Sequence, residues 1–507
     1  MKKNFVLLTV FVLVLFANNS YSLTVIPNSP WQQGFGIDTP AGSGRHLSTP
    51  KTTVYKVTNL NDSGPGSLRD ALENQNSPKV IIFEVSGNIE LKSGITIGGF
   101  TGNYAKTKGS YITIAGQTAP SPGITISGAP VKIERNCHDI LIQHIRFRLG
   151  DNVDDPDNAD TFATLWSYNV ERGWTSATDI VIDHCSFSWG VDENIENGSN
   201  NTTWSNNIFS EGLAYSIHLK GMHSKGFNTT AFNDGTTGSK NVMIVNNIFA
   251  HNYDRNPFIT AGDVAIANNV MYDYKWAIMT LDYEGGKGEI RVSVVGNYLI
   301  ETDIESSPMY ICAGIETDSR IYLGPDNYWN GAVKTDPWND LSDSAERLKP
   351  GLPDSDVPAL NRAATAADAI WPSGYTATSA AAAKTYVLAN AGARPKDRDA
   401  VDTRIVSEVT AGSGTSALID CVYYQNSDCV AADDPINCCT GSKVGTCVRN
   451  DEEGWPNLAQ NTHILTVPPS PNEVQASGYT KLEEWLHGFL RIVEGKSSIS
   501  PLTLKLQ

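Results

Sequence analysis

Between about residues 53 and 300 the chain repeats a short pattern of apolar and polar positions. Runs of β-branched or apolar residues alternate with Asn, Gly and Ser, as in "HDILIQHIRFRLGD", "TDIVIDHCSFSWG", "KNVMIVNNIFAHN" and "GDVAIANNVMYDY". Each run has the composition and length of a strand and is bounded by turn residues. Segments with helical periodicity are nearly absent from this part of the sequence. The pattern therefore predicts an all-β region built from many short strands.

An asparagine recurs beside several of these runs, at Asn207, Asn247, Asn269 and Asn297. The spacing indicates a base repeat of about 20–28 residues with one long insertion, which is typical of a solenoid. We expect these asparagines to occupy one corner of successive coils, adopt the left-handed conformation and hydrogen-bond to their neighbours. A β-sandwich with Asn-rich turns is the alternative, but its hairpins would alternate apolar and polar residues more regularly. The prediction is an all-β, right-handed, single-stranded parallel β-helix.

The segments on either side of this repeat have a different pattern. The stretch "GPGSLRDALE" predicts a short helix that begins at Ser67 and caps the open end of the stack. Beyond about residue 330 the chain gains helix signals. A helix is predicted over 380–390, with Ser379 to cap it and Gly392 to end it.

A last helix is predicted from Thr480, where Glu483 completes a capping box. Its apolar side chains form one face, made of Leu482, Trp485, Leu486, Phe489 and Val493. That face needs a partner, and we expect it to pack on the outside of the coils. The sequence thus predicts a β-helix domain at 23–330 and a partly helical C-terminal extension at 331–507 that packs on it.

The N-terminal residues 1–22 are predicted to be a signal peptide. Lys2 and Lys3 precede an apolar run that is too short to span a membrane, and small residues follow it. The protein is therefore expected to be secreted, into the medium or a periplasm. Loss of the two lysines changes the formal charge from −17 to −19. So acidic a chain is not expected to bind nucleic acid, and we expect a monomer that leaves the membrane after cleavage.

Five of the eight cysteines lie close together, in a Cys-rich insert at 421–447. They are Cys421, Cys429, Cys438, Cys439 and Cys447. In an oxidising compartment such a cluster predicts disulfide bonds that staple a loop. A zinc site is the alternative, but the insert has no CxxC pair and no nearby His.

Acidic residues are crowded in the stretch "DHCSFSWGVDENIE", which contains Asp192, Glu193 and Glu196. In a stack of coils, residues one coil apart in sequence become neighbours, and Asp160 precedes Asp183 by about one repeat. The acids could therefore converge. A cluster of oxygen ligands favours a hard cation, and Ca²⁺ is the usual one in secreted proteins. Solvated loop acids are the alternative, and spacing alone does not separate the two.

Several of these phrases together carry a family resemblance. "TIAGQTAPSPGITISG", "DIVIDHCSFSWGVDE", "SEGL…HLKGMHSKG" and "AHNYDRNPFI" resemble the pectate lyases of polysaccharide lyase family 1, in particular the bacterial and fungal branch with the AGQTAP phrase. The similarity runs from about Gly34 to Asn330, with weaker echoes in "RPKDRDAVDTRIV" and "DEEGWP". The resemblance implies a right-handed parallel β-helix, in agreement with the periodicity, and makes 23–330 the catalytic domain.

The resemblance also implies a calcium site. Asp160 matches the family's first calcium-binding aspartate, while Asn158 stands where a second one often lies. The later calcium ligands of the family are two carboxylates four residues apart. Here Asp192 and Glu193 are adjacent, and Glu196 is the residue four after Asp192. We predict that Asp192 and Glu193 are the ligand pair. Asp183 and His184 match an Asp-His strand whose role near the site is mainly structural.

For catalysis the resemblance implies that Arg255 removes the C5 proton of the substrate. A second arginine often follows five residues later, and Thr260 stands there instead. Lys220 resembles the lysine that pairs with a substrate carboxylate, with Lys225 as the competing position. Calcium and Lys220 beside Arg255 would lower the pKa of the guanidinium, so activity is expected to rise on the alkaline side.

The implied function is calcium-assisted β-elimination in polygalacturonate (pectate). Ca²⁺ would bridge the acidic protein and the acidic polymer and neutralise the substrate carboxylate next to the departing proton. Two alternatives stay open: a lyase for another uronate-containing polysaccharide, and a non-catalytic glycan-binding β-helix. The first would use the same site. The second is opposed by the presence of Arg255 beside the acids.

Overall fold

The computed structural model describes most of the chain. The described residues are 33–98, 108–151, 153–165, 174–214, 216–229, 239–260, 262–273, 277–281, 289–300, 307–311, 318–329, 331–338, 362–412, 419–423, 446–449 and 459–495. The predicted signal peptide lies outside them, as do Cys312 and most of the Cys-rich insert. Cys137 and Cys185 are buried free thiols. In the described part of the chain, the helices are all too short or too polar to cross a membrane.

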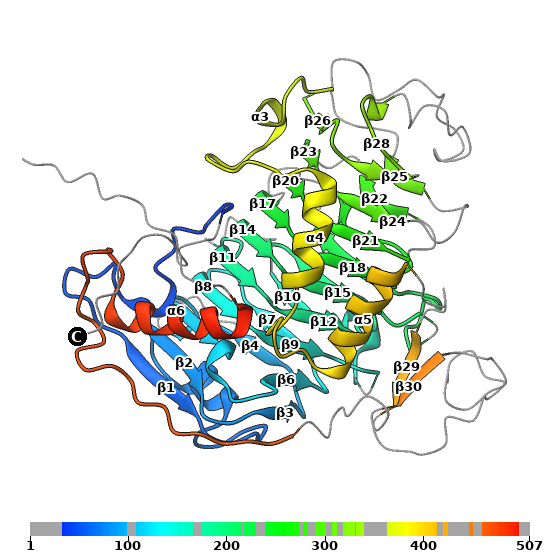
Figure 1. Cartoon of the computed structure of the whole chain (residues 1–507). Coiled ribbons are helices and arrows are strands. Elements are labelled where there is room, and N and C mark those ends of the chain that lie inside the picture. Colours follow the sequence, from blue (N-terminus) through cyan, green and yellow to red (C-terminus); the bar gives the residue numbers. More distant parts are fainter. Residues whose placement is uncertain are drawn as a thin grey trace, which may run out of the picture.

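Three sheets form the body of the molecule, and their strands are parallel except for the last pair of the third sheet (Figure 1). The first sheet contains β1 (Thr53–Val57), β2 (Lys79–Phe83), β5 (Ile112–Ala115), β8 (His138–Gln143), β11 (Thr178–Asp183), β14 (Asn200–Ser205), β17 (Ser239–Val245), β20 (Gly262–Ala267), β23 (Ile290–Val295) and β26 (Arg320–Leu323). The second sheet contains β4 (Ile95–Ile97), β7 (Val131–Ile133), β10 (Phe162–Thr164), β13 (Glu193–Asn197), β16 (Lys225–Thr229), β19 (Phe258–Ile259), β22 (Ala277–Leu281) and β25 (Ser307–Ile311). The third sheet contains β3 (Gly87–Glu90), β6 (Ile124–Ser127), β9 (Ile145–Arg148), β12 (Ser186–Ser188), β15 (Ile208–Ser210), β18 (Ile248–Ala250), β21 (Val270–Tyr272), β24 (Tyr298–Ile300), β27 (Tyr328–Trp329) and β28 (Ala332–Val333).

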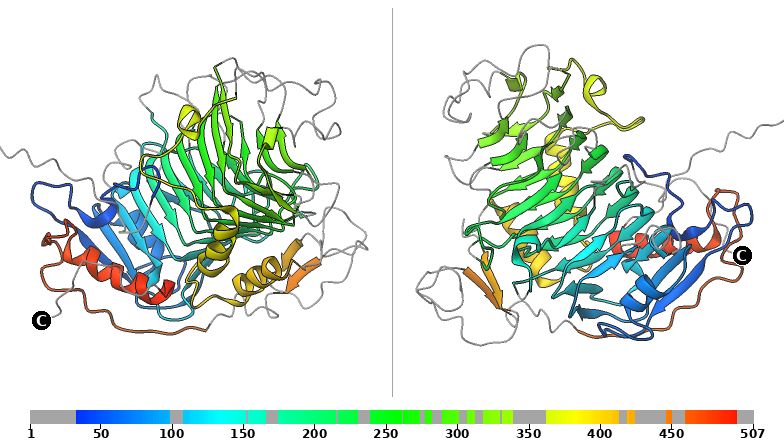
Figure 2. Two further views of the ribbon diagram at one scale, coloured as in Figure 1. Left: turned by 45° about the horizontal axis from the view of Figure 1, so that its top comes forward. Right: turned by 180° about the vertical axis from the view of Figure 1, so that it is seen from behind.

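The chain visits the three sheets in turn, so each coil adds one strand to each sheet. Strands such as β8, β11 and β14 pair in parallel without a shift in register, and Figure 2 shows the resulting stack from two further sides. The parallel β-helix predicted from the repeat is therefore confirmed. Its interior is filled by one side chain above another: Phe147, Phe187 and Phe209 lie in register, with ring centroids 5.1 and 5.5 Å apart.

The recurring asparagines form a ladder at one corner, as predicted. The Oδ1 of Asn247 accepts the backbone N–H of Asn207 at 2.7 Å, and the same bond links Asn247 to Asn269 and Asn269 to Asn297. The ladder continues to Asn327, which the repeat did not reveal. The expected left-handed conformation was assigned to the wrong residue. It belongs to the preceding one, as at Asn206 and Asn246, because the turn itself precedes the ladder position.

The short helices lie at the ends and along the sides of the stack. They are η1 (Ala41–Ser43), η2 (Asp70–Asn74), η3 (Gly116–Thr118), η4 (Pro156–Asn158), α3 (Ala366–Ala369), α4 (Ala380–Asn390), α5 (Ala400–Ala411) and α6 (Lys481–Glu494). The predicted caps are confirmed: Ser379 caps α4, and Thr480 with Glu483 forms the capping box of α6. The segment after Ser67 is helical, with Leu68 and Leu72 packed into the main core. The parallel β29 (Ile419–Tyr423) and β30 (Thr446–Arg449) make a separate sheet.

Helix α6 packs on the outer surface of the first coils (Figure 1). Leu482 and Leu486 are buried with Val80, Ile82 and Ala115, the outward residues of β2 and β5. Helices α4 and α5 instead cover the outward residues of the third sheet, where Val387 and Val401 share a core with that sheet. The amphipathic face of α6 therefore lies where the sequence predicted it.

Candidate metal centre

Three acids from two consecutive coils meet at the edge of the second sheet where its strands begin. The backbone N–H of Thr161 donates to the carbonyl of Glu193 at 3.0 Å, and that of Asp192 donates to the carbonyl of Ala159 at 3.2 Å. These bonds hold the residues just before β10 beside Asp192 and Glu193, where β13 begins. As a result, one carboxylate oxygen each of Asp160, Asp192 and Glu193 lies within 4.8 Å of the others. The structure thus brings together the three residues that were predicted as calcium ligands.

The loop that carries Asp192 and Glu193 is tied down by an asparagine. The Oδ1 of Asn194 accepts the backbone N–H of Gly190 at 3.0 Å, and its Nδ2 donates to Asn252, two coils further on, at 3.1 Å. Both asparagines are buried. A satisfied, buried network of this kind is rigid, so it holds the backbone of the two acids in place.

The acid cluster carries more negative charge than its surroundings balance. Asp160 is only 7% exposed, and burial followed by the charges of Glu193, Glu196 and Asp192 raises its pKa well above the ordinary value. A backbone N–H, that of Glu193, donates to Asp160 at 3.3 Å. Burial also raises the pKa of Glu193, although Arg255 opposes the rise. Crowded, partly desolvated carboxylate oxygens are the donor set that Ca²⁺ prefers, so these residues fit the predicted ion.

Glu196 lies apart from this group, three residues beyond Glu193 on the same strand, β13. Its carboxylate accepts a hydrogen bond from Asn228 Nδ2 at 3.0 Å. Ile195 beside it points into the core, so Glu196 belongs to the outer face of the second sheet. Of the acids in the loop, Asp192 and Glu193 are therefore the two that join Asp160.

Arg255 forms an ion pair with Glu193. The residue has a φ of 58°, the left-handed region that non-glycine residues seldom adopt, and it comes directly before β19. Its guanidinium also lies 4.7 Å from the ring centre of Phe258. Burial lowers the pKa of Arg255, but the charges of Glu193, Asp254, Asp192 and Glu196 outweigh it and raise the pKa above its ordinary value.

The two candidate lysines occupy different positions. Lys220 is exposed, in a turn where its backbone N–H donates to His218 Nδ1 at 3.1 Å. Lys225 begins β16 and pairs in register with Glu193. Its ammonium group lies 2.8 Å from Asp254. Lys225 is thus part of the charged surroundings of Arg255, whereas Lys220 projects from the neighbouring turn.

Asp183 and His184 lie at another corner of the coil, between the first and third sheets. Both are buried, and Asp183 accepts hydrogen bonds from Ser205, Asn206 and Gln143 at 2.7 to 3.0 Å. Burial alone would raise the pKa of Asp183, but His184 and these donors lower it. His184 occupies the turn position that Asn206 occupies one coil later. The pair therefore stabilises this corner. It faces α6 and lies away from the acid cluster.

Two histidines from the turn before β16 contact the cluster. The Nε2 atoms of His218 and His223 lie 3.3 and 2.7 Å from one oxygen of Asp192. Their rings are stacked, with centroids 3.7 Å apart. Burial, followed by the charge of His218, lowers the pKa of His223 to about 3, so its ring is neutral at physiological pH. Both histidines are visible in the phrase "HLKGMHSKG", but the direction of their side chains depends on the loop conformation.

A row of residues on the outer face of the second sheet runs past the cluster. Lys132, Ala163, Glu196, Asn228 and Phe258 are in register on successive strands. Successive strands lie about 4.8 Å apart. Only Lys132 and Glu196 of this row are partly exposed, because Ala163, Asn228 and Phe258 are 6% exposed or less.

Sequence comparison places the chain among known proteins. It is 27% identical over 485 residues to "Probable pectate lyase C" of Neosartorya fischeri, covering 94% of this chain and 97% of that protein. The protein of the same description from Aspergillus oryzae is 28% identical over 467 residues, covering 91% and 93%. Over most of its length the chain is thus similar to proteins described as probable pectate lyases. No family model matches it.

Comparison with solved structures finds further similar chains. A pectate lyase variant from Xanthomonas campestris has a TM-score of 0.43 and 15% identity, covering 73% of this chain and 100% of that one. Jun a 1, the major allergen from cedar pollen, has a TM-score of 0.43 and 17% identity, covering 70% and 90%.

Proposed function

We propose that the protein is a secreted lyase that cleaves polygalacturonate by calcium-assisted β-elimination. The observation that carries the proposal is the contact of Arg255 with Glu193, because it joins the predicted base to the predicted metal ligands. The full-length similarity to proteins described as probable pectate lyases supports the same substrate class. Signal cleavage and a monomeric state remain part of the proposal.

Asp160, Asp192 and Glu193 would hold the calcium ion. When bound, the ion would neutralise the acids and the C6 carboxylate of a galacturonate, which makes the neighbouring C5 hydrogen more acidic. The strongly raised pKa of Asp160 supports this assignment, since crowded carboxylates gain most from a cation. An acidic protein can then bind an acidic polymer.

In this proposal Arg255 accepts the C5 proton. Its ion pair with Glu193 keeps the guanidinium protonated, so the base is inactive while Glu193 is engaged with it. Diversion of Glu193 to a cation removes the largest of the charges that raise the pKa of Arg255. Deprotonation still requires alkaline conditions, because an arginine has an intrinsic pKa above about 12.

The remaining side chains position the substrate. The outer row of the second sheet passes beside Arg255, and its two partly exposed side chains, Lys132 and Glu196, would face an extended sugar chain, while Lys220 stands exposed on the adjoining turn. We propose that Lys220 pairs with a substrate carboxylate. Lys225, already paired with Asp254, would instead fix the local charge balance.

The test is to incubate the purified protein with polygalacturonate, in calcium or in chelator, and to follow the ultraviolet absorbance of the unsaturated product. We expect absorbance to grow only with calcium, and faster as the pH rises above neutral. A signal only on another uronate polymer would change the substrate. Binding without product would favour the glycan-binding alternative, and a maximum at acidic pH with saturating calcium would contradict Arg255 as base.

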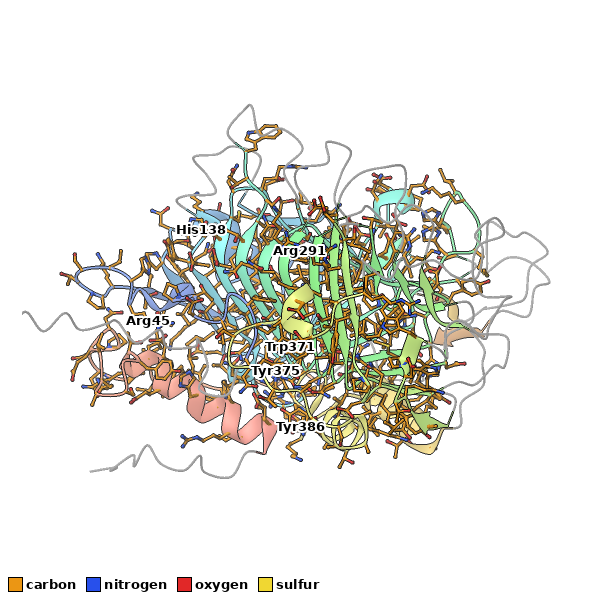
Figure 3. All side chains as sticks on the ribbon, turned by 90° about the horizontal axis from the view of Figure 1, so that it is seen from above. Arg45, His138, Arg291, Trp371, Tyr375 and Tyr386 are labelled. Atoms are coloured by element: carbon orange, nitrogen blue, oxygen red, sulfur yellow. The ribbon has the colours of Figure 1, made fainter. Side chains whose placement is uncertain are left out.

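A matched pair of variants tests the residue. Arg255→Lys should lower the rate by about 10²–10⁴-fold, the usual contribution of a general base. Arg291, labelled in Figure 3, is a half-exposed arginine of β23 that lies 3.6 Å from Asp263. Arg291→Lys should leave the rate unchanged. Equal rates in the two variants would exclude the proposed role of Arg255.

A further inference from the structure

A second group of ligand-type side chains adjoins the three carboxylates. His218, His223 and Asp192 each offer one donor atom, and the three atoms lie within 4.8 Å of one another. Asp192 belongs to both groups. The two groups differ in chemistry, because one offers only oxygen and the other offers two imidazole nitrogens and one oxygen.

The histidine group has the features of a built site. His218 is 4% and His223 6% exposed. Their Nε2 atoms point at the same oxygen of Asp192, at 3.3 and 2.7 Å. Within the described part of the chain, the buried Nε2 of His218 makes no hydrogen bond, although it lies this close to a carboxylate. A buried imidazole nitrogen without a hydrogen bond is costly unless another ligand engages it.

The opposite side of His218 also suits metal coordination. Its Nδ1 accepts the backbone N–H of Lys220 at 3.1 Å and lies 3.5 Å from Asp157 Oδ1. A metal at Nε2 would require the ring proton to move to Nδ1, so the bond from the Lys220 N–H would be lost and Nδ1 would donate to Asp157 instead. A carboxylate behind a coordinating histidine is the usual support in metal sites, since it fixes the ring and its tautomer.

We propose that His218, His223 and Asp192 bind a divalent transition-metal ion of the zinc, cobalt or nickel class. Imidazole nitrogens select such ions over Ca²⁺, which takes oxygen ligands. Because Asp192 is shared, the transition-metal ion and the ion of the carboxylate cluster compete for it. Each should therefore weaken the binding of the other by the same factor. The site does not depend on the proposed lyase activity.

The experiment is a titration of the chelator-treated, full-length protein with Co²⁺, followed by visible absorption, and with Zn²⁺, followed by calorimetry. We expect one equivalent to bind with the absorption bands of nitrogen-ligated Co²⁺. His223→Gln should weaken binding by at least about 10-fold. The control is His138→Gln, which removes a partly buried histidine from β8 in the first sheet (Figure 3) and should bind like the parent.

Two results would overturn the proposal. One is unchanged Co²⁺ affinity in the double variant His218→Gln, His223→Gln, which would move the ion to another cluster such as His144, His184 and Glu494. The other is the absence of binding by the parent protein. If the double variant does not fold, proton NMR with Co²⁺ decides: two shifted imidazole N–H signals in the parent, one of which is lost in His223→Gln, support the site, and their absence or their persistence in that variant excludes it. Lyase assays are not needed, so failure here is separate from failure of the proposed function.

Discussion

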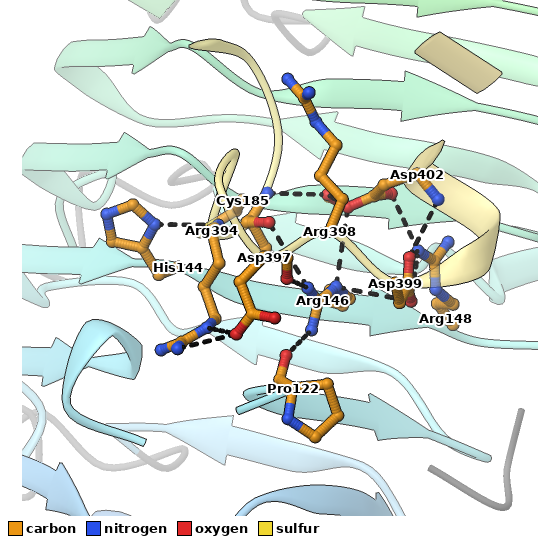
Figure 4. A network of polar contacts seen from close by, with 12 residues as sticks. Pro122, His144, Arg146, Arg148, Cys185, Arg394, Asp397, Arg398, Asp399 and Asp402 are labelled. Atoms are coloured by element: carbon orange, nitrogen blue, oxygen red, sulfur yellow. Dashed lines mark hydrogen bonds and ion pairs between the residues drawn. The ribbon is translucent and has the colours of Figure 1, made fainter. Parts of the chain in front are cut away.

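Two regions of this β-helix bury carboxylates, and they treat the charge in opposite ways. At the side of the third sheet, Arg146 and Arg148 meet Asp399 and Asp402, with ion-pair distances from 2.8 to 3.6 Å (Figure 4). At the start of the second sheet, three acids converge on one another and only Glu193 has an arginine partner.

The pKa values express this contrast. Burial would raise the pKa of Asp399, but Arg148 and Arg146 lower it below its ordinary value. The pKa of Asp160 is raised by burial and by its acidic neighbours together. The first network is balanced and attaches the C-terminal extension to the coils. The second is unbalanced, and in the proposed function a cation would balance it.

The largest expected effect is the loss of one partner from the balanced network. Arg148→Met leaves Asp399 and Asp402 buried with a single arginine, and should lower the free energy of unfolding by about 3–5 kcal/mol. Urea denaturation measures this. The control Arg291→Met removes a half-exposed arginine and should cost at most about 1 kcal/mol. Similar losses in the two variants would contradict the balanced network.

Calcium should have the next largest effect, and only on the acid cluster. At a concentration 100 times its dissociation constant, the ion stabilises the folded protein by about 2.7 kcal/mol. Asp160→Asn should abolish that gain and make the chelator-treated protein more stable, because it removes one of the repelling charges. Thermal unfolding with calcium and with chelator measures both. Asp154→Asn, at an exposed acid of the same loop, should respond to calcium like the parent.

Mild acid should separate the two regions. The raised pKa of Asp160 means that its charge destabilises the fold, so in chelator the protein should gain stability as the pH falls through that pKa. The lowered pKa of Asp399 gives stability that persists until the pH falls further, through its folded-state value. Unfolding midpoints in chelator test this. The gain should be missing from Asp160→Asn, and an identical profile in that variant would refute the assignment.

A smaller effect is expected at alkaline pH, at the histidine that faces α5. Burial lowers the pKa of His251, but Asp273 and Glu408, at 2.7 and 2.9 Å, raise it to about 9. A raised histidine pKa gives stability that is lost as the pH climbs through that value. We expect a loss of about 1 kcal/mol from pH 8 to 9. His251→Gln should remove this dependence, and its persistence would place the titrating group elsewhere.

What the sequence could predict follows from the period of the coils. The ladder of Asn207 and its successors, and the meeting of Asp160 with Asp192 and Glu193, depend on residues one coil apart. The repeat makes such residues neighbours. The repeat also predicted the fold, whereas the outer position of α6 was predicted from its apolar face.

The remaining contacts depend on conformations that the period does not encode. The direction of His218 and His223, and the contrast between Lys220 and Lys225, are set by the turn before β16. The pairing of Arg148 with Asp399 joins residues 251 apart, which no repeat relates. The left-handed turn residue was misassigned by one position because Asn206 and Asn207 have the same side chain.

The contact between His144 and Glu494 has a consequence for how the chain is assembled. These residues are 350 apart in sequence, yet both are fully buried, and Glu494 is the final residue of α6. During synthesis the coil that carries His144 emerges long before its partner, and its buried imidazole stays open to water until the last helix arrives. The earliest coils therefore cannot complete their packing until α6 has been synthesised. A chain that stops before α6 would leave their apolar flank uncovered.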